Sequence, residues 1–218
     1  MGTAHFTQRS LQEAYDMVRR LRPQDLAIEL DLQRYKILND RCLACPSRGS
    51  CVRRCEFIGA TDALGNADAY IWLIDVSEGE IARRIRGQMT STEYSNLAHL
   101  PRVLGSSVNE ARLWERGFKD LVMQRSMERL QRLREYFPSI WRVLIDERNT
   151  LMAARLAWIV TKRLDEGIEE PKTLALVGAA HVEGGEELLR TPLSIRQGLR
   201  RLGLSFSPPT PIRRIKIT

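Results

Sequence analysis

The chain has 218 residues, 43% of them hydrophobic, which is enough to bury the core of one domain and excludes wholesale disorder. The formal net charge of +7 would suit an anionic partner, but the basic residues spread along helical stretches without interleaved aromatics, so we expect a solvated surface and no nucleic-acid binding. No apolar stretch approaches the roughly 18 residues that a membrane span requires, and no export signal opens the chain, so we expect a soluble cytoplasmic protein.

The first elements in chain order are a helix and a strand. An apolar stripe at helical spacing predicts a helix over residues 10–22, with Ser10 and Glu13 as its capping box. The segment DLAIEL (25–30) predicts a short buried strand. Residues 41–69 contain the cysteines and several glycines, and we interpret them as a Cys-rich insertion or lid.

The remaining segments alternate between strands and amphipathic helices. We expect strands over 70–75, 173–178 and 211–217, and helices over 77–87, 108–136, 146–167 and 194–203. Strands that alternate with helices are typical of a parallel sheet covered on both faces. The sequence therefore predicts a single α/β domain over residues 1–218, with a mixed, largely parallel sheet flanked by helices.

Two of the three histidines stand in the same short motif. His5 and His181 each follow a glycine by three positions, in GTAH and GAAH. Ligands of open α/β sheets bind outside the carboxyl ends of the strands, and Gly2 and Gly178 stand where two strands should finish. If these strands are parallel neighbours, both imidazoles project into one crevice. The alternative is that each histidine has only a structural role.

Glu29 supplies a third group for such a crevice. It lies in the apolar segment LAIEL, where an unpaired carboxylate is costly and needs a cation, a metal or a hydrogen-bond network. Two histidines and one carboxylate are a common ligand set for Zn, Mn, Fe or Co. A metal held there would activate water and polarise a carbonyl. The alternative for Glu29 is a buried ion pair with Arg148 or Arg34.

All four cysteines fall in the segment CLACPSRGSCVRRC (42–55). Cys42, Cys45, Cys51 and Cys55 have the spacing Cys-x2-Cys-x5-Cys-x3-Cys, which suits tetrahedral zinc or an iron–sulfur cluster. Neighbouring arginines would offset the thiolate charge and lower the pKa values of the cysteines. The alternatives are two disulfides or redox-sensing thiols.

Three separated blocks resemble the TraB/PrgY (GumN) family, in that family's order. Residues 2–35 resemble its opening, with a Gly-Thr-x-His, a Ser-started helix and a strand that ends in Glu-Leu. The segments DERNTLMAARLAWIV (146–160) and LALVGAAHVEGGEELL (174–189) resemble its closing blocks. The resemblance implies a fold shared with the Tiki proteases and with the erythromycin-esterase and ChaN-like proteins. The Tiki relatives are metal-dependent proteases that favour manganese or cobalt, and PrgY-like members act in the shutdown of peptide pheromones.

The resemblance also implies a metal-binding role for three residues. His5 and His181 match the two motif histidines of the family, and Glu29 matches its strand glutamate. These three residues would hold one divalent metal, such as Mn, Co or Zn, and Glu29 would also serve catalysis. The implied substrate is a peptide or a signal peptide.

Further residues match the family's pattern around this set. Arg34 matches the arginine after the glutamate strand, and together with Gly2 and Gly178 it would bind a cofactor or ligand. Glu147 and Arg148 match a Glu-Arg pair, in which the glutamate would act as general base and the arginine would steady an oxyanion or a substrate carboxylate. The alternative for this pair is a salt bridge at the start of a helix.

The chain also departs from the family's pattern. The family usually has a strand before the first Gly-x-x-His, whereas Met1 directly precedes Gly2, so we expect this strand to be either upstream or missing. The middle strand often ends in Asp-Arg, where this chain has Asp75-Val76, so an anion-binding arginine is lost there. Many archaeal members continue into a C-terminal membrane region, whereas this sequence ends at Thr218.

We therefore predict a metal-dependent, peptidase-like hydrolase with a second metal in the cysteine segment. One rival interpretation is a non-catalytic regulator that binds a peptide, haem or a partner protein. Another is a metal or redox sensor built on residues 42–55. The sequence has no glycine-rich nucleotide loop and no Gly-x-Ser-x-Gly elbow, which argues against a nucleotide-binding fold and a serine hydrolase.

Overall fold

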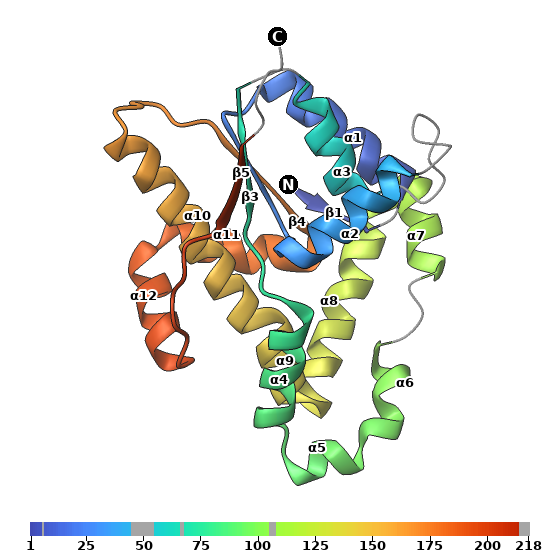
Figure 1. Cartoon of the computed structure of the whole chain (residues 1–218). Coiled ribbons are helices and arrows are strands. Elements are labelled where there is room, and N and C mark those ends of the chain that lie inside the picture. The colour runs from blue at the N-terminus through green and yellow to red at the C-terminus, as the bar shows by residue number, and fades with distance from the viewer. Residues whose placement is uncertain (6, 45–54, 66–67, 105–107, 214–218) are drawn as a thin grey trace.

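The computed structural model describes residues 1–5, 7–44, 55–65, 68–104 and 108–213, in which five strands form one sheet in the order β1-β4-β2-β3-β5 (Figure 1). The first four strands run parallel, and β5 pairs antiparallel with β3 at the edge. The strands are β1 (Gly2–Thr3), β2 (Asp25–Ile28), β3 (Tyr70–Leu73), β4 (Thr173–Gly178) and β5 (Thr210–Arg213). The prediction of a mixed, largely parallel sheet flanked by helices is confirmed.

Strand β4 lies between β1 and β2, although it is the last of the four parallel strands along the chain. Gly2 pairs with Val177 on one side of β4, and Ile28 pairs with Leu176 on the other. Because parallel strands all end at the same edge, the segments that follow β1, β2, β3 and β4 emerge side by side. We call this edge the carboxyl rim.

Helices cover both faces of the sheet because successive strand residues point to opposite sides. Leu26 and Ile28 pack in the cluster formed with α1 (Gln8–Leu21) and α3 (Glu56–Ala63), whereas Ala27 packs with Met152 and Ile159 of α10 on the other face. The remaining helices around the sheet are α2 (Leu32–Leu43), η4 (Ala179–His181), α11 (Val182–Arg190) and α12 (Pro192–Arg201), and α10 spans Arg148–Asp165.

A lobe of helices lies beyond the carboxyl rim (Figure 1). Leu133, Phe137 and Ile140 form part of its own buried core. The helix predicted over 108–136 is divided in two, because Gly117 takes a φ of +93° between the parts. The lobe consists of α4 (Glu78–Gln88), α5 (Ser91–Ser95), η2 (Leu97–His99), α6 (Leu100–Leu104), α7 (Val108–Glu115), α8 (Lys119–Tyr136), α9 (Pro138–Trp141) and the π-helical turn η3 (Arg142–Glu147).

The predicted start of the first helix is wrong. Helix α1 begins at Gln8, and its N-cap is Thr7, whose hydroxyl accepts a hydrogen bond from the backbone N–H of Ser10 at 3.2 Å. Ser10 is buried inside the first turn, where its own hydroxyl accepts from Ala4 N at 3.0 Å. Glu13 forms ion pairs elsewhere. Ser10 and Glu13 do not form the predicted capping box because the helix begins earlier, after Thr7, and threonine is also a favoured N-cap residue.

Residues 41–69, which we interpreted as an insertion or lid, include helix α3. Residues 45–54 lie outside the described part of the chain. Phe57 and Ile58 are buried in the same cluster as the residues of α1 and β2. Residues 56–63 therefore form a layer of the fold itself.

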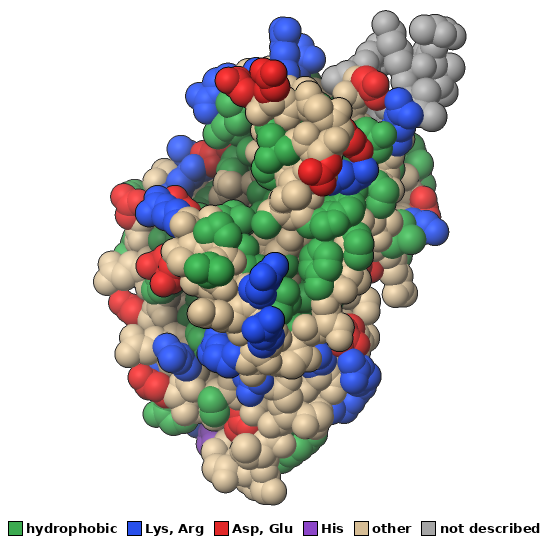
Figure 2. All heavy atoms as spheres, turned by 90° about the vertical axis from the view of Figure 1, so that its left-hand side faces the viewer, with side chains coloured by type: hydrophobic (Ala, Val, Ile, Leu, Met, Phe, Trp, Pro, Cys, Tyr) green, Lys and Arg blue, Asp and Glu red, His purple; other side chains and the backbone are tan. Residues whose placement is uncertain are grey.

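The described surface mixes charges of both signs. On the face shown in Figure 2, Lys and Arg side chains lie among Asp and Glu side chains, with apolar side chains between them. Among the described residues, none of the helices has both the length and the apolar character that crossing a membrane requires.

Candidate functional site

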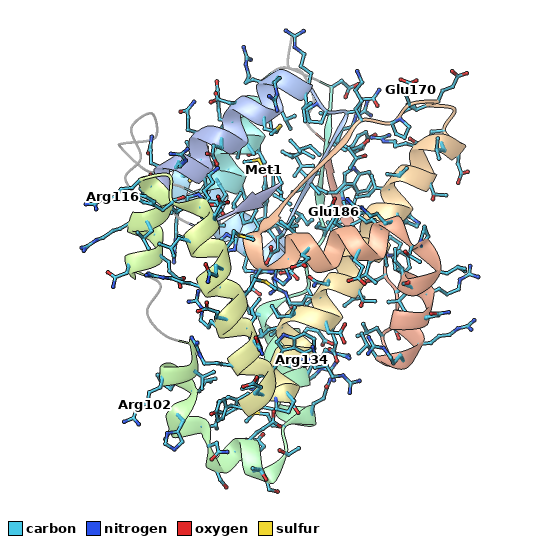
Figure 3. The ribbon with its side chains drawn as sticks, turned by 180° about the vertical axis from the view of Figure 1, so that it is seen from behind. Met1, Arg102, Arg116, Arg134, Glu170 and Glu186 are labelled. Atoms are coloured by element: carbon cyan, nitrogen blue, oxygen red, sulfur yellow. The ribbon has the colours of Figure 1, made fainter. Side chains whose placement is uncertain are left out.

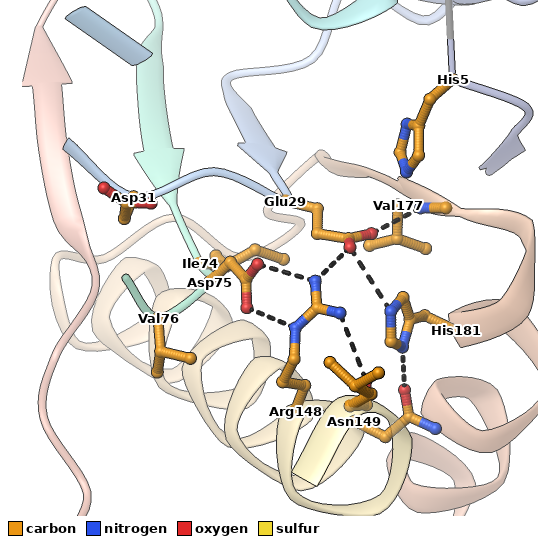
Figure 4. A network of polar contacts seen from close by, with 12 residues as sticks. His5, Glu29, Asp31, Ile74, Asp75, Val76, Arg148, Asn149, Val177 and His181 are labelled. Carbon is orange, nitrogen blue, oxygen red and sulfur yellow. Dashed lines mark hydrogen bonds and ion pairs between the residues drawn. The ribbon is translucent and has the colours of Figure 1, made fainter. Parts of the chain in front are cut away.

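Four polar side chains meet at the carboxyl rim (Figure 4). His5 follows β1, Glu29 follows β2, Asp75 follows β3 and His181 follows β4. Arg148, the first residue of α10, lies among them. Residues far apart in the sequence are thus brought together because their strands end at one edge of the sheet.

Glu29 is the centre of this group. Its side chain is 5% exposed, and its two carboxylate oxygens have different partners. Oε1 accepts a hydrogen bond from Nη2 of Arg148, and Oε2 accepts one from the backbone N–H of Gly178 at 2.5 Å. The buried carboxylate is therefore neutralised by an arginine, as the ion-pair alternative for Glu29 requires, with Arg148 as the partner.

Arg148 also binds Asp75 with two donors. Its Nε lies 3.0 Å from Oδ1 of Asp75 and its Nη2 lies 2.7 Å from Oδ2. Burial raises the pKa of Asp75, but the hydrogen bonds and charges of Arg148 and Arg34 outweigh it and lower that pKa to about 2. Nη1 of Arg148 donates to the carbonyl of Leu144 at 3.2 Å, so all three guanidinium nitrogens are engaged.

Arg34 stands one step further from the crevice. Its Nη2 donates to Oδ2 of Asp75 at 2.7 Å and to the carbonyl of Val76 at 2.9 Å. Its Nε donates to Asp31, the N-cap of α2. Arg34 therefore reaches the rim through Asp75 rather than through Glu29.

His181 is fixed through one ring nitrogen. Its Nδ1 lies 2.7 Å from Oδ1 of Asn149, and since an amide oxygen can only accept, Nδ1 carries the proton. Nε2 is then left as an acceptor, 3.4 Å from Oε1 of Glu29. Burial lowers the pKa of His181 more than Glu29 raises it, so the imidazole is neutral at pH 7. Two acceptor atoms thus face each other across a short gap.

His5 approaches the same gap from β1. Its Nδ1 lies 2.6 Å from Oε1 of Glu56 on α3. Burial lowers the pKa of His5, but the hydrogen bond and charge of Glu56 outweigh it, and the pKa is raised. A Cβ on Gly178 would lie 2.9 Å from Nε2 of His5 and 3.4 Å from Oε2 of Glu29, so only glycine leaves room for both groups there. The His5 side chain is 43% exposed and forms the open side of the group.

The donor atoms suit a divalent metal in chemical type. Each imidazole is anchored through Nδ1 by a polar partner, which is the usual arrangement of metal-binding histidines. His5 and His181 then present Nε2 beside the carboxylate of Glu29. Within the described residues, however, no three or more His, Cys, Asp or Glu side chains are gathered closely enough to form a finished coordination group.

Residues 86–192 match the model of the TraB/PrgY/gumN family. Over these residues, just under half of the chain, the sequence is similar to that family. No curated protein and no solved structure matches the chain. The matched segment contains Arg148, Asn149 and His181, whereas His5 and Glu29 precede it.

Glu147 lies outside the group at the rim. It is 1% exposed, and Oε2 accepts from Nε of Arg84 at 2.5 Å while Oε1 accepts from Gln88 at 2.8 Å. Both partners belong to α4, so Glu147 links η3 and α10 to α4. Its position matches the salt-bridge alternative for the Glu-Arg pair.

Gly2 has a packing reason of its own. A Cβ at this position would lie 2.7 Å from Cγ2 of Val182 and 3.2 Å from Cα of Ala179. Glycine therefore lets β1 pass closely over the start of α11. The two backbone links Val177 N to Met1 O (3.1 Å) and Met1 N to Ala175 O (2.8 Å) extend this edge.

The cysteine segment is only partly described. Cys42 lies near the end of α2, and Cys55 is the N-cap residue of α3. Burial raises the pKa of Cys55 to about 12, so its thiol is protonated at pH 7. Cys45 and Cys51 lie outside the described residues, and so does the four-cysteine site predicted with them.

Three residues of the site were not predicted from the sequence. Asp75 ends an apolar strand in the same way as Glu29, and this pattern could have placed it at the rim. Asn149 follows Arg148 directly, but its contact with His181 has no sequence signal. Glu56 lies beside the last cysteine, in a segment interpreted as an insertion, and nothing in the sequence connects it to His5.

A cleft of about 790 Å³ opens next to the rim. It is lined by residues of α8, η3, α11 and α12, and Asn149 and Ala180 belong to its wall. Figure 3 shows α8 and α11 from this side, with Arg134 at the α8 wall. The cleft therefore reaches the residue that orients His181.

Proposed function

We propose that this protein is a divalent-metal-dependent hydrolase of peptide or ester bonds, with His5, Glu29 and His181 as the metal donors. The observation that supports the proposal best is the meeting of two imidazoles, each fixed through Nδ1, beside one carboxylate at the carboxyl rim. The metal would be Mn, Co or Zn, which such a donor set binds.

The metal, when bound, would polarise a substrate carbonyl and activate water. The residues of the chain set the conditions for this chemistry. Glu56 and Asn149 fix the rotation and tautomer of the two imidazoles. Arg148 orients Glu29 through its hydrogen bond to Oε1, and since the guanidinium nitrogens are all engaged, Arg148 acts through Glu29. Glu29 would accept the proton of the attacking water. Glu147, the general base expected from the sequence, is bound to α4 and lies outside the group at the rim.

The substrate would lie in the cleft beside Asn149. The cleft volume of about 790 Å³ falls in the usual range for ligand sites. The exposed edge of His5 marks the open side of the group, while Glu29 and His181 stay buried. Water would therefore be largely excluded from the buried part of the group.

Metal binding is the first test. Purified protein is stripped of metal, and Mn²⁺, Co²⁺ and Zn²⁺ are titrated calorimetrically into wild type and into the variants His5→Ala and His181→Ala. His99→Ala serves as the matched control, because His99 is exposed on η2. We expect one equivalent of metal in wild type and control, and a loss of affinity of at least about tenfold in the other two. Equal affinity in all four proteins would contradict the metal site.

Turnover is tested separately. Wild type loaded with each metal is incubated with a peptide library, and cleavage is followed by mass spectrometry with His181→Ala as the inactive reference. Cleavage by wild type alone supports the hydrolase. Metal binding without cleavage contradicts it and supports the rival interpretation of a non-catalytic binding protein.

We also propose that Cys42, Cys45, Cys51 and Cys55 bind a second metal, either zinc or an iron–sulfur cluster. Visible absorbance of anaerobically purified protein would support the cluster, whereas a colourless protein with one zinc would support zinc. The substitution Cys42→Ser should remove this metal and leave metal binding by His181 unchanged. A protein with neither metal would contradict the proposal.

A further inference from the structure

A second pocket lies at the end of the lobe, away from the sheet. It has a volume of about 430 Å³ and is formed by η2, α6 and the last turns of α8. Figure 3 shows Arg102, one of its wall residues, on α6 in the lower part of the molecule, well below Met1 at the sheet. The pocket is therefore separate from the residues at the carboxyl rim.

The charges around this pocket have one sign. His99, Arg102 and Arg132 belong to its wall, and no acidic residue of the described part of the chain does. Neither Arg102 nor Arg132 forms an ion pair with any described residue. Three arginines elsewhere in the lobe do form ion pairs: Arg83 with Glu80, Arg84 with Glu147, and Arg129 with Glu110. Two guanidinium groups without carboxylate partners beside one pocket favour an anionic ligand.

The rest of the pocket is apolar and aromatic. Phe137 is fully buried at its base, and Val103 is 8% exposed beside it. Tyr136 lines the same pocket, and 58% of its surface is exposed, which leaves a ring available for stacking. A ligand that combines an anionic head with a flat apolar body would use both kinds of surface.

We propose that this pocket binds a phosphate monoester carried on an aromatic ring. Arg102 and Arg132 would each donate two hydrogen bonds to the phosphate. Two oxygens of one phosphate fit the paired N–H groups of a guanidinium better than a single oxygen does. The ring of the ligand would stack on Tyr136 over the apolar base. The net charge of +7 would draw such an anion toward the protein.

The test uses phenyl phosphate as the probe, titrated calorimetrically into metal-stripped protein at one fixed low salt concentration. We expect saturable binding at one site, and weaker binding of inorganic phosphate. Arg102→Gln and Arg132→Gln should each weaken the binding of both probes by about tenfold or more, because a charge-assisted hydrogen-bond pair is lost. Tyr136→Ala should weaken the binding of phenyl phosphate and leave that of inorganic phosphate unchanged.

Arg196→Gln is the matched control, because Arg196 is an exposed arginine of α12 outside the pocket. It removes the same charge and should leave binding unchanged. The proposal is overturned if wild type does not bind phenyl phosphate, if both pocket arginines can be replaced without effect, or if the control weakens binding equally. It is also overturned if the two probes bind equally well. Binding that persists in His181→Ala supports a site independent of the rim.

Discussion

Oε1 of Glu56 lies 2.6 Å from Nδ1 of His5, and this contact joins the first loop of the chain to helix α3. Glu56 is 1% exposed, and it also accepts a hydrogen bond from the hydroxyl of Thr3 at 3.1 Å. A buried carboxylate therefore fixes the ring of the more exposed histidine of the rim.

Replacement of Glu56 should change the titration of His5. In Glu56→Gln the raised pKa of His5 should fall, because burial lowers this pKa and the charge of Glu56 no longer offsets it. The charged form of His5 stabilises the fold below its ordinary pKa of 6.5, and this contribution is lost as pH rises through the raised value. NMR titration of the imidazole measures the shift. Glu135→Gln, an exposed change on α8, is the control, and an identical His5 titration in wild type and Glu56→Gln would refute this expectation.

Loss of the Arg148 guanidinium should destabilise the protein severely. Arg148→Met leaves Glu29 and Asp75 buried without their main cation, which typically costs about 3–5 kcal/mol of unfolding free energy. Urea unfolding at pH 7 measures it. Arg196→Met, an exposed change, should stay within about 0.5 kcal/mol of wild type. A small effect of Arg148→Met would show that the rim carboxylates do not depend on it.

Acid should unfold the protein partly through Asp75. Its folded-state pKa of about 2 lies below its ordinary value of 3.8, so its contribution is fully present above 3.8 and is lost as pH falls toward 2. The shift corresponds to about 2 kcal/mol. In Asp75→Asn the unfolding free energy should start lower but decline less over this range. Parallel declines of wild type and variant would contradict the assignment.

A methyl group at Gly178 should disturb the site more than the fold. In Gly178→Ala the new Cβ would lie 2.9 Å from Nε2 of His5, so the imidazole must move, and metal affinity should fall together with about 1–3 kcal/mol of stability. Gly185→Ala on α11 is the matched control, because its Cβ meets nothing within 4 Å. This control should gain about 0.5–1 kcal/mol and bind metal normally. Equal metal affinity in both variants would count against crowding at His5.

Much of the sheet could be predicted from the sequence, because its strands are short apolar runs that end in a charged or small residue. The strand 173–178 matches its prediction at both ends, whereas β2 and β3 each end two residues earlier than predicted, at Ile28 and Leu73. The sequence predicted that His5 and His181 would meet if the strands before them were parallel neighbours. Strands β1 and β4 are parallel neighbours.

The partners at the rim could not be predicted in the same way. Arg148 and Arg34 were both candidates for the ion pair with Glu29. Which of them forms it depends on where α10 begins relative to the sheet. Glu56 and Asn149 contact the histidines across long separations in sequence, and single polar residues in helices carry no periodic signal. Neighbouring residues on a helix point about 100° apart, and Glu147 contacts α4 while its neighbour Arg148 contacts the rim.

The short first strand has a consequence for the motion of the site. Strand β1 consists of Gly2 and Thr3 alone, extended by two backbone hydrogen bonds of Met1 to β4, whereas β4 lies between two neighbours. Amide hydrogen exchange should therefore be fast at this edge and slow along β4, since local opening there breaks few contacts. We therefore expect the wall of the crevice that carries His5 to open more readily than the wall formed by β2 and β4, so that a bound ligand would slow amide exchange at this edge.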